Sequence, residues 1–183
     1  MLERDRAVEM RPGRLTRVTP IGPQDVARLY APLGALMAVA AETATPRASQ
    51  TDVIRMTRHN ESLLEALESN DPIAARAADR EFHAVLLSLA ANPYLETAIE
   101  PLLLHARRLE TLYFRDTKPG RESYEEHGQI VLAVSKGDAA GAAELSRHNF
   151  TRFWTPPPEI ETPSPTEQNP DDRHPTYPAP RRS

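Results

Sequence analysis

Apolar residues recur every three to four positions from about residue 24 to residue 154, which is the spacing of amphipathic helices. In the first segment with this spacing, Leu29, Leu33 and Leu36 lie on one face, and Thr45-Pro46 predicts its end. We find no convincing internal repeat, and alternation of apolar and polar residues is confined to the first 20 positions. The pattern predicts an all-α fold over residues 24–154.

Short polar and proline-containing segments divide this region into about six helices, which we expect to pack as an antiparallel bundle. A helix over about residues 50–69 has Ser49 or Thr51 as its candidate N-cap. The remaining boundaries are predicted at Asn70-Asp71-Pro72, Asn92-Pro93, a break at Lys118-Pro119-Gly120 and a turn at Lys136-Gly137-Asp138. Pro101 is expected to bend its helix if it lies in the interior.

The two ends of the chain differ from this helical region. Within residues 1–20, Val8 and Met10 are expected to face Thr16 and Val18 in a β-hairpin, with Pro and Gly central in its turn. Residues 155–183 contain nine of the 18 prolines and almost no apolar pattern, so we expect a disordered tail there.

Composition limits the classes of protein that the chain can represent. Its 183 residues suffice for one domain with a sizeable core, and the absence of cysteine excludes disulfides, thiolate metal sites and cysteine nucleophiles. No apolar run approaches the length of a membrane span and the N-terminus is charged, so we expect a soluble, cytoplasmic protein that does not bind membranes. The net charge of -4 argues against broad nucleic-acid binding; five arginines against three acids in residues 1–18 restrict any DNA contact to that end.

Four potential metal ligands occur on three of the predicted helices: Asp79, His83, His127 and His148. Asp79 and His83 lie four residues apart, so one helical turn directs both side chains to the same side. Three imidazoles and one carboxylate suit zinc, nickel or manganese, with positions left open for water or a ligand. A single helix histidine is more often a surface or core residue than a ligand, and only the first pair is locally constrained.

The ordered combination of DREFH, ANPYLE, EEHGQIVLAVSKGDAAGAA and LSRHN resembles the all-helical C-terminal effector (FCD) domain of GntR-family transcriptional regulators of the FadR branch. The segment LERDRAVEMRPGRLTRV is similar to the end of the recognition helix and the wing hairpin of their winged helix-turn-helix domain. The resemblance divides the chain into a wing remnant at 1–20, an effector domain at 24–154 and the tail at 155–183.

This resemblance implies a ligand-controlled regulator and not an enzyme. It assigns metal binding to Asp79, His83, His127 and His148, and it implies a small carboxylate effector at the metal. Arg107 and Arg108 are the candidate cations for that effector, although a solvated stripe on their helix explains them equally well. The partners that it implies are a second copy of the chain or a full-length relative.

Two departures from the family pattern alter these expectations. The first helices of the DNA-binding domain are missing from the sequence, so Arg11, Gly13 and Arg14 of the hairpin should give only weak DNA binding, or binding through a partner. Leu33 and Met37 stand where the family usually has Arg and Glu, which alters either the charge of the ligand cavity or its packing.

Two other classes of function remain open from the sequence. Three histidines and one aspartate with an open coordination position could activate water, as in a metal-dependent hydrolase built on a helical bundle. The candidate general bases nearby in sequence are Glu81, Glu125 and Glu126, and none lies in a recognisable catalytic motif. The third class is a truncated dimerisation module.

Overall fold

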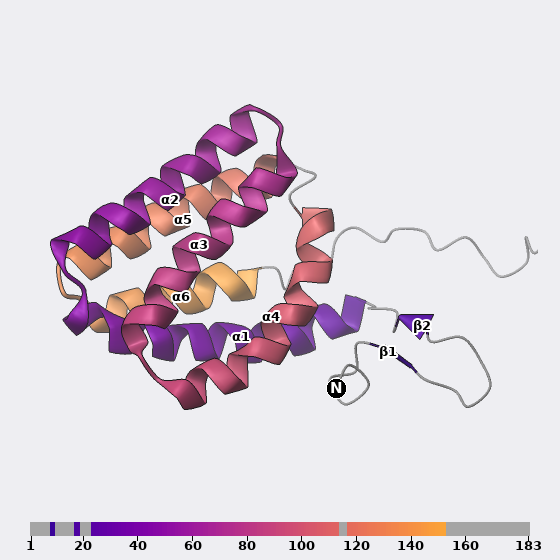
Figure 1. The fold of residues 1–183 in the computed structure, drawn as a ribbon, viewed down its shortest axis with the longest axis horizontal. Helices are drawn as coiled ribbons and strands as arrows, with labels where there is room; N and C mark the ends of the chain where they lie inside the picture. The colour runs from indigo at the N-terminus through magenta and orange to yellow at the C-terminus, as the bar shows by residue number, and fades with distance from the viewer. Residues whose placement is uncertain (1–7, 10–16, 19–22, 114–116, 153–183) are drawn as a thin grey trace, which may run out of the picture.

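The computed structural model describes residues 8–9, 17–18, 23–113 and 117–152, and its described part is an all-α bundle as the sequence predicts (Figure 1). Six α-helices and one short 3-10 helix form the bundle. They are α1 (Pro23–Ala44), η1 (Thr45–Arg47), α2 (Gln50–Glu68), α3 (Pro72–Ala90), α4 (Pro93–Tyr113), α5 (Thr117–Ser135) and α6 (Ala139–Thr151).

Two short strands precede the bundle. Strand β1 (Val8–Glu9) pairs with β2 (Arg17–Val18) in antiparallel orientation, with Val8 opposite Val18 as the hairpin prediction requires. The turn that contains Arg11, Gly13 and Arg14 lies outside the described residues, as does the predicted tail at 155–183.

Side-chain caps define several of the helix ends that the sequence predicts. Ser49 accepts a hydrogen bond from the backbone N–H of Asp52, whose carboxylate in turn accepts from the Ser49 backbone, so a capping box starts α2. Asp71 Oδ1 accepts from the first N–H groups of α3, and Asn92 Oδ1 does the same for α4. Gly137 has a φ of 71° in the turn before α6, where a side chain would be strained.

Prolines and glycines occur inside α4 and α5. The predicted break at Lys118-Pro119-Gly120 is wrong, because α5 begins at Thr117 and includes all three residues in its first turns, where proline is tolerated. Gly120 faces α2, and a Cβ there would lie 2.5 Å from Cδ2 of Leu67. Pro101 lies inside α4, which changes direction along its length in Figure 1 as expected.

The helices pack in two groups that share a core. Helix α2 lies against α3 and α5, while α1 lies along α6 and also contacts α3 and α4 (Figure 1). Phe82 and Leu86 of α3 and Ile130 of α5 are fully buried in the central cluster. Leu33 and Met37 are fully buried against Ile99 and Phe150, so their replacement of the expected Arg and Glu changes packing. Among the described helices, none is long and apolar enough to cross a membrane.

Candidate metal centre

Three of the predicted ligands meet in the interior of the bundle. Asp79 and His83 come from successive turns of α3, and His127 reaches them from α5. His127 Nε2 lies 3.2 Å from His83 Nε2 and 3.6 Å from Asp79 Oδ1. One ligand atom from each of the three residues lies within 4.8 Å of the other two. Helical spacing places the first pair, and the packing of α5 supplies the third residue.

Burial keeps both imidazoles uncharged. Burial lowers the pKa of His83 to about 3, and the nearby Asn149 side chain opposes that shift. The pKa of His127 is also lowered well below its usual value, by burial first, then by repulsion from the His83 ring when that ring is protonated, and by the positive charge of Arg152. Phe82 stacks on the His127 ring with centroids 3.8 Å apart, which helps to exclude water. Neutral imidazoles are the form that coordinates metal ions.

Asn60 of α2 fixes the tautomer of His127. The Asn60 Nδ2 donates to the backbone carbonyl of Tyr124 at 2.9 Å, which leaves Oδ1 directed at His127 Nδ1, 3.1 Å away. Because an amide oxygen can only accept, Nδ1 carries the ring proton and Nε2 presents its lone pair to Asp79 and His83. The sequence analysis did not identify Asn60, and no local motif marks it.

His148 is not brought into this cluster. Its side chain is 63% exposed, and its Nε2 lies 3.6 Å from Glu126 Oε1 at the outer side of the site. The inward face of α6 instead carries Ala142, Ser146 and Asn149, all of them buried. Asn149 is only 3% exposed and contacts the His83 ring. We therefore exclude His148 from the candidate cluster, because the turn of α6 directs that side chain outward.

A charged network connects Asn149 to the end of α6. Asn149 Nδ2 donates to Glu126 Oε2 at 2.7 Å, and Arg152 Nε lies 3.0 Å from the same oxygen. Arg152 also donates to Glu122 Oε2 at 2.9 Å and to Ser123 Oγ at 2.7 Å. Glu126 is therefore neutralised by Arg152, so it is held as a structural carboxylate between α5 and α6.

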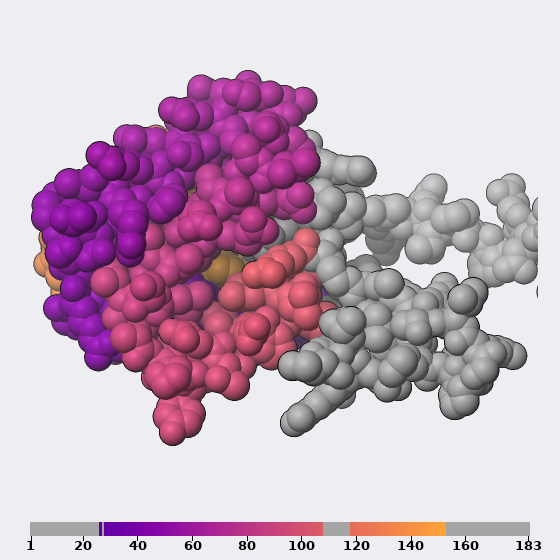
Figure 2. Space-filling model, in the orientation of Figure 1, coloured from indigo at the N-terminus to yellow at the C-terminus, as the bar shows by residue number. Residues whose placement is uncertain are grey.

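The remaining predicted site residues lie elsewhere. Arg107 is exposed on α4, and the side chain of Arg108 lies outside the described residues. Glu81 and Glu125 are exposed. On the face shown in Figure 2, the surface is hollowed between α3 and α4, and atoms of α6 are visible at the bottom of this hollow.

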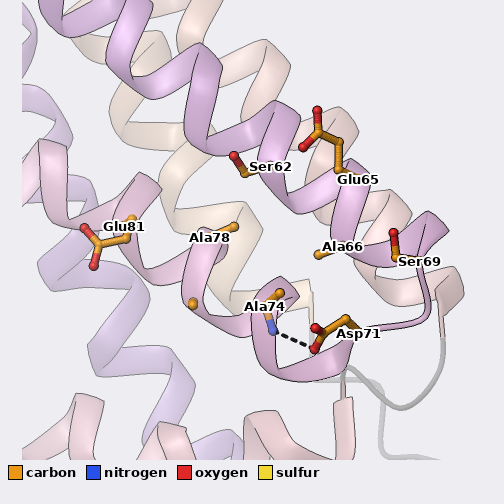
Figure 3. Close-up of a pocket in the computed structure, with 9 residues that line it drawn as sticks. Ser62, Glu65, Ala66, Ser69, Asp71, Ala74, Ala78 and Glu81 are labelled. Carbon is orange, nitrogen blue, oxygen red and sulfur yellow. Dashed lines mark hydrogen bonds between the residues drawn. The ribbon is translucent and has the colours of Figure 1, made fainter.

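A separate groove of about 440 Å³ runs between α2 and α3 (Figure 3). Small side chains such as Ala66, Ala74 and Ala78 line it, and Asp71 at its end is engaged in capping α3. None of the three cluster residues lines this groove. The candidate metal ligands and this surface groove therefore lie in different parts of the bundle.

The residues of the cluster fit a divalent ion. Two neutral Nε2 atoms and one carboxylate oxygen converge, and an Nε2–Nε2 separation of 3.2 Å agrees with two imidazoles bound to one ion at about 2.1 Å each. When His83 Nε2 binds a metal, Nδ1 carries the ring proton, and this buried nitrogen has no hydrogen-bond acceptor among the described residues. Three protein ligands leave further positions open for water or an effector.

This fold and its buried His and Asp cluster define a helical ligand-binding domain. Residues 28–152 match the model of the FCD domain, so the chain belongs to the FCD family, the effector domains of GntR-family transcriptional regulators. These regulators are transcription factors and not enzymes, which confirms the non-enzymatic expectation and removes the hydrolase alternative. No curated protein is significantly similar to the chain in sequence.

Solved structures with the same fold include other regulators. E. coli McbR/YncC superposes with a TM-score of 0.72 at 19% identity, over 84% of this chain and 79% of that one. Lar, described as controlling expression of the Listeria monocytogenes agr system, gives 0.65 at 13% identity, over 84% and 73% of the two chains. Streptococcus agalactiae GntR gives 0.54 at 18% identity, over 84% and 76%.

Proposed function

We propose that residues 28–152 form a metal-dependent effector domain in which Asp79, His83 and His127 hold a divalent ion that binds a small carboxylate. The observation that carries this proposal is the convergence of these three side chains within 4.8 Å inside an FCD domain. Zinc, nickel and manganese all accept imidazole nitrogen together with carboxylate oxygen. The ion would supply a Lewis-acidic position for an oxygen of the effector.

The protein residues prepare this position before any ligand arrives. Asn60 holds the His127 Nε2 lone pair toward the centre, and burial keeps both imidazoles neutral at physiological pH. Asp79 contributes the one carboxylate of the cluster, so a divalent ion keeps a net positive charge that favours an anionic effector. Arg107 and Arg108 of α4 remain the candidate cations for the effector, and Arg107 is exposed.

Regulation would follow from the origin of the ligands on different helices. Asp79 and His83 belong to α3 and His127 belongs to α5, so binding at the centre stabilises one arrangement of these helices over others. In a dimer of two such domains, or of one with a full-length relative, this arrangement sets the spacing of the attached DNA-binding heads. DNA contact by Arg11, Gly13 and Arg14 is proposed to be weak and lost with added salt.

Calorimetry can test the proposal on the full chain. Protein stripped with a chelator is titrated first with zinc, nickel or manganese and then, metal-loaded, with a panel of organic and sugar acids. We expect one metal ion per chain and carboxylate binding only by the metal-loaded protein, with the acid recovered unchanged by mass analysis. Carboxylate binding that persists in the chelator-treated protein would contradict the proposed role of the metal.

A further inference from the structure

Helix α6 carries a buried polar side chain beside the cluster, Asn149, that was not among the metal ligands predicted from the sequence. The buried positions of α6 follow a helical repeat and are Ala142, Ser146, Asn149 and Phe150. His148, next to Asn149 in sequence, points away from this buried face. Asn149 is 3% exposed, whereas the His148 side chain is 63% exposed. Asn149 is also the residue of α6 whose side chain acts on His83, because it raises the pKa of that ring against the effect of burial. Ser146 and Asn149 are the buried polar residues of α6, and Asn149 is the one that affects the pKa of His83.

The orientation of the Asn149 amide is determined by charge. Its Nδ2 donates to Glu126 Oε2 at 2.7 Å, and a carboxylate can only accept, so the nitrogen end of the amide faces Glu126. The oxygen end is consequently left for the other side, where the His83 ring lies. Arg152, directly after α6, holds Glu126 with its Nε 3.0 Å from the same carboxylate oxygen. The pair of Glu126 and Arg152 thus holds the amide in one orientation.

We propose that Oδ1 of Asn149 is the fourth protein ligand of the metal that Asp79, His83 and His127 bind, and that Glu126 positions it. This inference rests on the proposed metal site and adds a residue to it. The donor set then contains two imidazole nitrogens, one carboxylate oxygen and one amide oxygen. His148 lies outside it and serves as a matched control on the adjacent position of the same helix.

An amide oxygen in place of a third imidazole should shift the preference of the site from zinc and nickel toward manganese. Amide and carboxylate oxygens suit manganese better than they suit zinc or nickel, for which a third imidazole would be the stronger donor. Replacing Asn149 with His should therefore raise affinity for zinc and nickel more than affinity for manganese. Replacing it with Asp retains an oxygen donor at the same position, so Asn149→Asp should keep manganese binding.

The experiment compares metal binding by wild type, Asn149→Ala, Asn149→Asp, Asn149→His, Glu126→Gln and His148→Ala. Calorimetric titrations of chelator-treated full chain with manganese and with zinc give the dissociation constants, and circular dichroism of the metal-free proteins confirms that each variant is folded. We expect Asn149→Ala and Glu126→Gln to weaken binding by about tenfold or more, and His148→Ala to leave it unchanged. Asn149→His should increase the ratio of zinc to manganese affinity.

The outcomes separate this inference from the proposed function. The role of Asn149 would be overturned if Asn149→Ala binds metal as tightly as the wild type, or if His148→Ala loses metal binding. Neither result would contradict the metal site formed by Asp79, His83 and His127. If Asn149→Ala fails to fold, an unchanged zinc-to-manganese ratio in Asn149→His would overturn the role instead. No metal binding by the folded wild type would overturn both proposals together.

Discussion

Asn60 controls the chemistry of His127 through one hydrogen bond. In Asn60→Ala, His127 Nδ1 loses its 3.1 Å acceptor, so either tautomer of the ring becomes accessible. We expect metal affinity to fall by about 10–100-fold, as for other partners of metal-bound histidines. The free energy of unfolding should also fall by about 1–3 kcal/mol, because a buried donor is left unpaired. Calorimetry and urea unfolding measure the two effects, and unchanged metal affinity would contradict the role of Asn60.

The two buried histidines predict a pH dependence for the metal-free protein. The pKa of His83 falls to about 3 and that of His127 also falls, so below pH 6.5 the unfolded chain binds protons that the folded chain does not. The free energy of unfolding should therefore be constant above about pH 6.5 and decrease as the pH falls toward 3. Urea unfolding with chelator present tests this.

The variant His83→Leu provides the comparison for this pH dependence. It removes one of the two histidines with a lowered pKa, so its stability should fall less steeply between pH 6.5 and 4 than that of the wild type. Parallel curves for the two proteins would show that His83 is not held neutral in the folded state.

Sequence reasoning identified part of the candidate site, and its limits are physical. Asp79 and His83 could be paired because four residues on a helix share a face, whatever the fold. His127 could be chosen only as a candidate, since its distance from them depends on how α5 packs. For α6, the phase of Ala142 and Ser146 was available in the sequence and indicates position 149 as inward, but the chemistry of histidine drew attention to position 148.

At the level of elements, two glycines of α5 provide a matched pair. A Cβ at Gly120 would lie 2.5 Å from Leu67 Cδ2, whereas a Cβ at Gly128 would meet no atom within 4 Å. Both alanine substitutions should gain helix propensity of roughly 0.5–1 kcal/mol. Gly120→Ala should lose about 1–3 kcal/mol to overpacking against α2, so it should be the less stable variant in thermal unfolding. Equal stability of the two variants would show that α5 does not approach α2 so closely.

The same helix shows where element boundaries are hard to predict. Lys118-Pro119-Gly120 has the composition of a break, yet proline is tolerated in the first turn of a helix, and Gly120 lies where a Cβ would come 2.5 Å from Cδ2 of Leu67. The other boundaries followed from local chemistry alone, because Ser49, Asp71 and Asn92 cap helices through their own neighbours. Local signals predicted these helix ends, whereas the composition of residues 118–120 did not predict that α5 begins at Thr117.

For the whole molecule, the bundle should be independent of the proline-rich end. Residues 155–183 carry almost no apolar pattern, so deleting residues 156–183 removes little that could pack on the core. We expect the truncated protein to keep its helical circular dichroism, its melting temperature and its metal content. A large fall in melting temperature would show that this segment contributes to the fold.

The sequence alone could not decide whether Leu33 and Met37 alter the charge of a cavity or the packing of the core, and their burial decides this. Their place in the sequence showed that an expected Arg and Glu are missing, but whether charge or packing changes depends on contacts with Ile99 and Phe150, from α4 and α6. Both apolar residues extend the core between α1 and these helices, and the polar chemistry is concentrated instead around α3, α5 and the Glu126–Arg152 pair.

The binding of a divalent ion by Asp79, His83 and His127 is the claim on which the account depends, and thermal unfolding tests it most directly. Metal that binds only the folded state stabilises it, so chelation should lower the melting temperature of the wild type, and zinc, nickel or manganese should restore it. His127→Ala should lose this response and its bound metal, measured by elemental analysis. Equal metal content and equal restoration in wild type and His127→Ala would contradict the account.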